Sequence, residues 1–161
     1  MKKSLIYFWG GVIALAAAAL MSVSCTKDEI NSSDILGTWR HDYCDYKVYA
    51  NGKVVDSGRS EDDAQVLKFM SGGVGEYYYG DYGSEYPEYN NFTWKINGNK
   101  LTLYMDGLDN DMVDIDGDQI MKFTITSIDS DSMQLTLTQS GVDDGVKMKS
   151  VLVYNYKKIE D

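Results

Sequence analysis

Residues 91–105 read NFTWKINGNKLTLYM, and this stretch decides the fold class. On both sides of Asn97-Gly98, apolar and polar residues alternate with a period of two, as they do along a β-strand that buries one face. Asn-Gly also favours a two-residue type I′ turn, because both turn positions need a positive φ angle. Such a turn sets Trp94 opposite Leu101, so that the apolar side chains of both strands share one face. The stretch therefore predicts an antiparallel β-hairpin.

The same alternation extends over the chain on both sides of this hairpin. Alanine is the best helix former, yet only Ala50 and Ala64 remain beyond Cys25, and no stretch repeats apolar residues at helical spacing. The expected strands cover residues 38–50, 53–57, 65–71, 74–82, 91–97, 100–105, 121–126, 133–138 and 147–157. One apolar face on each strand is typical of an antiparallel sheet with one wet side.

A second turn signal is Asn51-Gly52, which pairs Ala50 with Lys53 and sets Val48 beside Val55. Short strands that are joined by hairpins form a meander. We therefore expect an all-β domain, an antiparallel up-and-down meander of about eight strands that closes into a barrel.

The start of the chain carries the three parts of an export signal. Lys2 and Lys3 form a positive beginning, residues 5–20 are apolar without a charge, and small residues precede Cys25. The alternative is an uncleaved transmembrane anchor, because residues 5–23 are long enough to cross a bilayer. No basic cluster follows that segment as a stop-transfer flank, which favours cleavage. We therefore expect residues 1–24 to be a lipoprotein signal peptide.

Cys25, at the end of the signal, is the expected site of lipid attachment. The segment Met21-Ser22-Val23-Ser24-Cys25 resembles a bacterial lipobox, although a leucine is usual at the position of Ser22. Acyl chains hold a protein on a bilayer because each buried CH₂ contributes about 0.8 kcal/mol. The alternative is a disulfide between Cys25 and Cys44 in an oxidising compartment. A disulfide does not explain a cysteine at the end of a signal, so we expect Cys44 to be a small, partly buried strand residue.

Residues 25–34 are expected to form a lipidated, flexible tether, because they are polar apart from Cys25 and Ile30. Lys27, Asp28 and Glu29 follow the cysteine closely and resemble the surface-export signal of Bacteroidota lipoproteins. An ordinary charged linker is the alternative. The resemblance implies an outer-membrane protein that faces the cell surface. We expect the folded domain to cover residues 35–161.

The chain is acidic, with a net charge of −10, and cleavage of the signal would remove two of its lysines. Nucleic acid is excluded as a partner, because binding to phosphates needs a basic face. An acidic domain is also not attracted to an anionic membrane surface, so we expect the lipid to provide the attachment. The charge itself we interpret as a source of solubility.

Five segments together form a recognisable pattern. They are Leu36-Gly37-Thr38-Trp39, Lys68-Phe69 with Gly72, Gly73 and Gly75 before Tyr77-Tyr78-Tyr79, the run from Trp94 to Leu101, the run from Thr124 to Ile128, and Tyr154-Asn155-Tyr156-Lys157-Lys158. The pattern is similar to that of the lipocalin-like lipoproteins of Bacteroidota and covers residues 35–159. The resemblance implies that Trp39 plugs the closed end of the barrel. Lipocalins commonly cover that tryptophan with an arginine, for which Lys157 or Lys158 would have to substitute here.

No catalytic residue is expected. His41 is the only histidine, and no Gly-x-Ser-x-Gly motif accompanies it, so we expect an ordinary strand histidine that is cation-bound or partly exposed. Residues 106–118 are the most acidic stretch, but an EF-hand frame that starts at Asp114 has Gln119 where glycine is required. We therefore expect no metal and no cofactor, with a calcium site in this acidic loop as the alternative.

Six tyrosines crowd one region: Tyr77, Tyr78, Tyr79, Tyr82, Tyr86 and Tyr89. Tyrosine is favoured in strands, which is the reading we prefer, but exposed aromatic residues also bind sugars and proteins. We expect a non-enzymatic, membrane-anchored, surface-exposed lipoprotein, and the lipocalin resemblance implies a calyx for a small hydrophobic ligand. The alternative is an adhesin or accessory interaction module that contacts glycan or protein through the Tyr-rich loop.

Overall fold

The structure, a computed structural model, describes residues 30–61, 65–79, 89–105 and 119–159. Within these ranges there are nine strands: β1 (Gly37–Ala50), β2 (Lys53–Ser60), β3 (Gln65–Met70), β4 (Val74–Tyr79), β5 (Tyr89–Asn97), β6 (Lys100–Met105), β7 (Gln119–Ile128), β8 (Ser132–Asp143) and β9 (Val146–Ile159). The all-β prediction is confirmed. This described part contains no helix long and apolar enough to cross a membrane.

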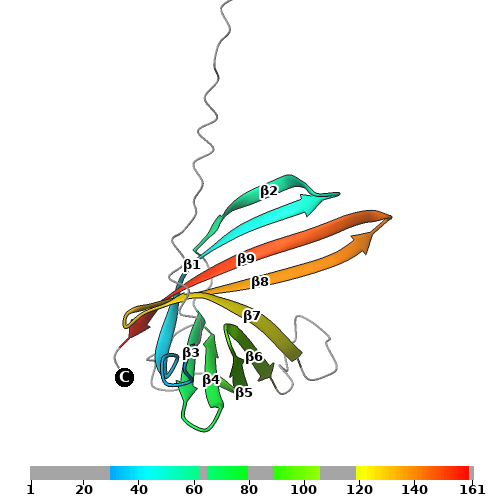
Figure 1. Cartoon of the computed structure of the whole chain (residues 1–161). Coiled ribbons are helices and arrows are strands. Elements are labelled where there is room, and N and C mark those ends of the chain that lie inside the picture. The colour runs from blue at the N-terminus through cyan, green and yellow to red at the C-terminus, as the bar shows by residue number, and fades with distance from the viewer. Residues whose placement is uncertain (1–29, 62–64, 80–88, 106–118, 160–161) are drawn as a thin grey trace, which may run out of the picture.

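The strands follow one another around a closed barrel (Figure 1). Each strand from β3 to β9 pairs antiparallel with its neighbour in sequence, β3 pairs with the first residues of β1, and β1 pairs with β9. β2 stands beside this ring, because it pairs with the later residues of β1. The predicted meander is therefore confirmed as an eight-stranded antiparallel barrel with one additional strand.

Four strands continue beyond one end of the barrel as a projecting sheet, which we call the arm (Figure 1). It comprises residues 46–60 of the β1–β2 hairpin and residues 138–151 of the β8–β9 hairpin. The two turns are Asn51-Gly52, with φ angles of 50° and 79°, and Asp144-Gly145, with φ angles of 46° and 81°. Both are typical of type I′ turns. The Asp-Gly turn explains why β8 and β9 run further than their alternation predicted.

The β5–β6 hairpin has a different register from the one predicted. Its two turn residues are Gly98 and Asn99, and Trp94 lies opposite Leu103 instead of Leu101. Gly98 has a φ of 59°, whereas Asn99 is not among the described residues with a positive φ. Glycine in the first position is typical of a type II′ turn. The register differs by an even number of residues, so the apolar side chains still share one face.

The β1–β2 hairpin has the predicted pairing of Ala50 with Lys53 at its turn. Further along, Val48 lies opposite Asp56, so the prediction that Val48 lies beside Val55 is wrong. The cause is a shift of register between Val48 and Tyr49, where β2 has one extra residue.

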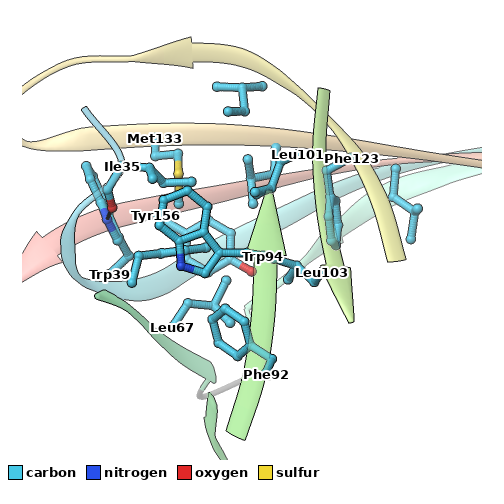
Figure 2. Close-up of a cluster of buried hydrophobic side chains, with 14 of the residues drawn as sticks. Ile35, Trp39, Leu67, Phe92, Trp94, Leu101, Leu103, Phe123, Met133 and Tyr156 are labelled. Carbon is cyan, nitrogen blue, oxygen red and sulfur yellow. Dashed lines mark hydrogen bonds between the residues drawn. The ribbon is translucent and has the colours of Figure 1, made fainter. Parts of the chain in front are cut away.

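The core fills the inside of the barrel with the inward residues of the alternating pattern (Figure 2). Phe69 packs edge-to-face against Phe92 and Trp94, with ring centroids 5.4 and 5.6 Å apart. The indole N–H of Trp94 donates a hydrogen bond of 2.8 Å to the carbonyl oxygen of Val74. The largest side chains therefore bury their apolar area while their polar atoms keep a partner.

Trp39 lies at the end of the barrel where β1 begins and β9 ends, and it is completely buried. Its indole N–H donates a hydrogen bond of 2.8 Å to the carbonyl oxygen of Ile35, which is also completely buried. Ile30 packs against the same core, and residues 31–34 form a turn. The segment that precedes β1 therefore covers this end of the barrel.

Of the two lysines expected near Trp39, Lys158 is the one that lies there. Its Nζ is 5.0 Å from the centroid of the Trp39 ring, within the range of a cation–π contact. Lys157 instead forms an ion pair of 2.9 Å with Asp42, and this carboxylate raises the pKa of Lys157. Gly37 has a φ of 118°, and a Cβ there would lie 2.7 Å from Cε of Lys158. A side chain at position 37 would therefore be strained and would displace the lysine.

We predict that Trp39→Ala lowers the free energy of unfolding by about 3–5 kcal/mol, because it removes a buried ring and leaves a cavity. Chemical denaturation followed by circular dichroism measures the change. Val142→Ala is the control, because Val142 is 72% exposed at the tip of the arm and its truncation should leave the midpoint unchanged. Equal midpoints for Trp39→Ala and the unmodified protein would contradict the structural role of this residue.

Candidate functional site

The barrel contains a cavity of about 190 Å³ that is partly open to solvent. The residues that line it are Gln65, Leu67, Tyr77, Leu103, Met105, Met121, Phe123, Tyr154 and Tyr156. Gln65 begins β3, Met105 ends β6, and Met121 lies near the start of β7. All three positions belong to the end of the barrel opposite Trp39. Figure 2 accordingly shows Trp39 and Ile35 on one side of the core and Leu103 and Phe123 on the other.

The register of the sheet brings these side chains together. Leu67 of β3 lies opposite Tyr77 of β4, and Leu103 of β6 lies opposite Met121 of β7. Paired residues of an antiparallel sheet present their side chains on the same face. Two strand pairs on different parts of the barrel therefore contribute opposing walls, and β9 adds two tyrosines.

His41 lies beside the aromatic wall of this cavity. It pairs with Tyr156 across β1 and β9, and its ring makes edge contacts with Tyr154 and Tyr156 at centroid distances of 5.8 and 5.5 Å. Only 6% of the residue is exposed. The expectation of a partly exposed histidine is therefore wrong, because the pairing with an inward-facing tyrosine turns His41 into the barrel.

The lining is apolar with a few hydrogen-bonding groups. The amide of Gln65 and the hydroxyls of Tyr77, Tyr154 and Tyr156 are its side-chain polar groups, and none of the described residues that line the cavity carries a formal charge. Apolar walls with a small number of polar groups are the usual composition of small-molecule sites. The arrangement is therefore suited to holding a small apolar molecule in a defined orientation.

The crowded tyrosines are divided between the two faces of the sheet. Tyr77 faces the cavity, whereas Tyr78 and Tyr89 lie together outside, with ring centroids 5.5 Å apart. Tyr78 also hydrogen-bonds through its hydroxyl to the carboxylate of Glu76. Tyr82 and Tyr86 lie outside the described residues. Side chains alternate between the two faces of a β-strand, which explains why some of the described tyrosine side chains point inward and others outward.

Several predicted site residues cannot be placed in the structure. Cys25, Lys27, Asp28 and Glu29 precede the described residues, and the acidic segment 106–118 lies between two described ranges. Among the residues that are described, no three His, Cys, Asp or Glu side chains gather as a metal site. Cys44 is buried in β1, opposite Tyr154 of β9.

The arm carries a second, open hollow of about 640 Å³. Tyr49, Lys147, Met148 and Lys149 contribute to it, and Nζ of Lys149 lies 5.6 Å from the centroid of the Tyr49 ring. At the base of the arm, Arg59 forms an ion pair of 2.8 Å with Asp45. The arm hollow is more open to solvent than the cavity in the barrel, so the cavity is the stronger candidate for a binding site.

Sequence reasoning did not identify the residues that line the cavity. All of them occupy inward positions of strands, and the alternating pattern marks those positions. The pattern does not distinguish an inward residue that meets another side chain from one that borders empty space. That distinction depends on residues from five different strands.

No protein-family model matches this sequence, and no curated protein matches it. Among solved structures, the chain is similar to a lipocalin-like protein from Bacteroides uniformis, with 14% identity, a TM-score of 0.48, and coverage of 78% of this chain and 99% of that chain. It is also similar to an uncharacterized protein from Bacteroides eggerthii, with 15% identity, a TM-score of 0.46, and coverage of 77% of this chain and 98% of that chain. Both likenesses concern the fold alone.

Proposed function

We propose that this protein is a lipid-anchored lipoprotein of the outer membrane, exposed at the cell surface, whose lipocalin-like barrel binds a small hydrophobic molecule without catalysing a reaction. The observation that carries the binding function is the cavity of about 190 Å³ inside the barrel, with its apolar and aromatic lining. Burial of apolar surface contributes about 25 cal/mol per Å², and a few polar groups suffice to orient a ligand.

The position of the first described residues indicates which end of the barrel the proposed anchor would hold. Ile30 follows Cys25 by five residues and packs against the core at the Trp39 end of the barrel. Five residues span at most roughly 18 Å when fully extended. A lipid on Cys25 would therefore hold the Trp39 end close to the membrane. The end that contains the cavity, together with the arm, would then point away from the membrane, where a ligand from outside could reach it.

We predict that a small molecule co-purifies with the protein and occupies the cavity. Native mass spectrometry of the full chain, extracted in detergent from cells that produce it, should show a species heavier than the apoprotein. The Met121→Trp variant should lose that species, because Met121 lines the cavity and the larger side chain fills it. An identical mass distribution for both proteins would argue against binding in the barrel.

We predict that Cys25→Ala abolishes lipid modification, because the thiol is the only group of this residue that can form the thioether. Metabolic labelling with a palmitate analogue measures the modification. Cys44→Ala is the matched control and should keep the label, since Cys44 is buried in β1. Undiminished labelling of Cys25→Ala would refute the lipoprotein assignment.

We predict that replacement of Lys27, Asp28 and Glu29 together by alanine retains lipidation but reduces exposure at the cell surface. Protease shaving of intact cells measures exposure, and palmitate labelling of the same cells checks that the anchor is intact. Replacement of Asn31, Ser32 and Ser33 by alanine is the control, because these polar residues follow the signal by only a few positions. If shaving removes the triple variant and the unmodified protein to the same extent, the export role of the three residues is wrong.

A further inference from the structure

We infer that the molecule bound in the barrel is a neutral, single-ring aromatic compound with one hydroxyl or amino group, and not a long acyl chain or an ionic ligand. This inference rests on the proposed binding function and specifies its ligand class. Three properties of the cavity carry it: its volume, its aromatic wall and the uncharged side chains of the described residues that line it.

The volume restricts the size of the ligand. The cavity measures about 190 Å³. An apolar protein cavity of roughly 150 Å³ takes up benzene, whereas pockets for drug-sized ligands measure roughly 300–1,000 Å³. A substituted benzene ring therefore fits inside the cavity, whereas a long acyl chain or a polycyclic molecule would have to extend out of its open side.

The wall is built from aromatic rings in edge-to-face contact. Phe123 meets Tyr154 at a centroid distance of 6.0 Å and an interplanar angle of 81°. His41 extends this array by its edge contact with Tyr154, and Tyr77 forms part of the lining from β4. Each pair of aromatic rings in such an arrangement contributes about 0.5–1.5 kcal/mol of stabilisation in addition to that from the burial of apolar area. A flat aromatic ligand continues the array, whereas an aliphatic ligand of the same size does not.

Two methionines complete the wall where aromatic rings are missing. Met105 and Met121 line the cavity from β6 and β7. A thioether sulfur makes favourable contacts with aromatic rings, and the unbranched side chain adapts its shape to a ligand. These residues add to the preference for a ring over a saturated molecule.

The charge of the lining restricts the ligand further. None of the described residues that line the cavity is Asp, Glu, Lys or Arg. Transfer of a carboxylate or an ammonium group from water into such a site costs free energy, and none of these described residues supplies an opposite charge to offset it. Gln65 and the tyrosine hydroxyls can exchange hydrogen bonds with one neutral hydroxyl or amino group. The site therefore favours a phenol or an aniline over a fatty acid or a quaternary ammonium ion.

Isothermal titration of the detergent-solubilised full chain with four probes tests the inference. We expect 4-methylphenol to bind with a stoichiometry of one, and 4-methylcyclohexanol, which has the same size but no aromatic ring, to bind at least fivefold more weakly. Palmitate and benzyltrimethylammonium should not bind. Binding of palmitate in preference to 4-methylphenol would overturn the inference and leave the proposed function intact. A preference for the ammonium probe or for the saturated alcohol would overturn it as well.

The variants connect binding to the cavity. Met121→Trp should weaken the binding of 4-methylphenol at least tenfold, whereas Met148→Trp should leave it unchanged, because Met148 is an equally half-buried methionine that lies in the arm. Thermal denaturation without ligand checks that both variants fold, and Met121→Phe with Met148→Phe gives a milder pair if tryptophan is not tolerated. Equal affinity in the two variants of a pair would overturn the inference. Failure of all four probes, combined with the absence of any co-purified molecule, would overturn the proposed function itself.

Discussion

β1 and β9 pair from Thr38 opposite Ile159 to Ala50 opposite Met148, and this pairing joins the last strand of the meander to the first. Closure satisfies the backbone hydrogen bonds that two open edges would otherwise expose to other chains. It also gives the sheet an inside and an outside, so that each alternating strand has one face to bury. A slip of one residue between β1 and β9 would reverse the faces of one of these strands, and so turn either Trp39 outward or Lys157 inward. The covered end, the cavity and the arm all depend on this one register.

The inside of the barrel is filled unevenly along its axis. Trp39 is completely buried at the covered end, where it donates a hydrogen bond to Ile35 and its ring lies near Nζ of Lys158. Toward the other end, the inward positions of β6 and β7 hold Leu103, Met105 and Met121, and these side chains leave a space open. This space is partly open to solvent, and its apolar and aromatic lining with a few polar groups is the usual composition of a small-molecule site.

The arm is a consequence of strand lengths that exceed the height of the barrel. β1 and β9 each have 14 residues, whereas β3, β4 and β6 each have six. The residues of β1 and β9 that extend beyond the barrel pair with β2 and with the later part of β8. β2 forms one edge of this projecting sheet. Lys53, Asp56 and Arg59 of β2 are exposed on that strand. Charged residues on an edge strand, together with the bulge beside Tyr49, discourage further strand addition.

The sequence by itself determined the strands, their antiparallel order and the inward side of the strands over residues 91–97, 100–105, 121–126 and 133–138, because alternation and turn residues are local properties of the chain. It did not determine the register of β5 and β6, since a shift of two residues preserves both faces and only the turn geometry at Gly98 selects between them. The choice of Lys158 over Lys157 beside Trp39 and the burial of His41 depend on pairing with β9 across more than 100 residues. The cavity was least predictable of all. Its volume is the space inside the barrel minus the volume of the side chains that five strands place there. Only the tertiary structure determines both volumes.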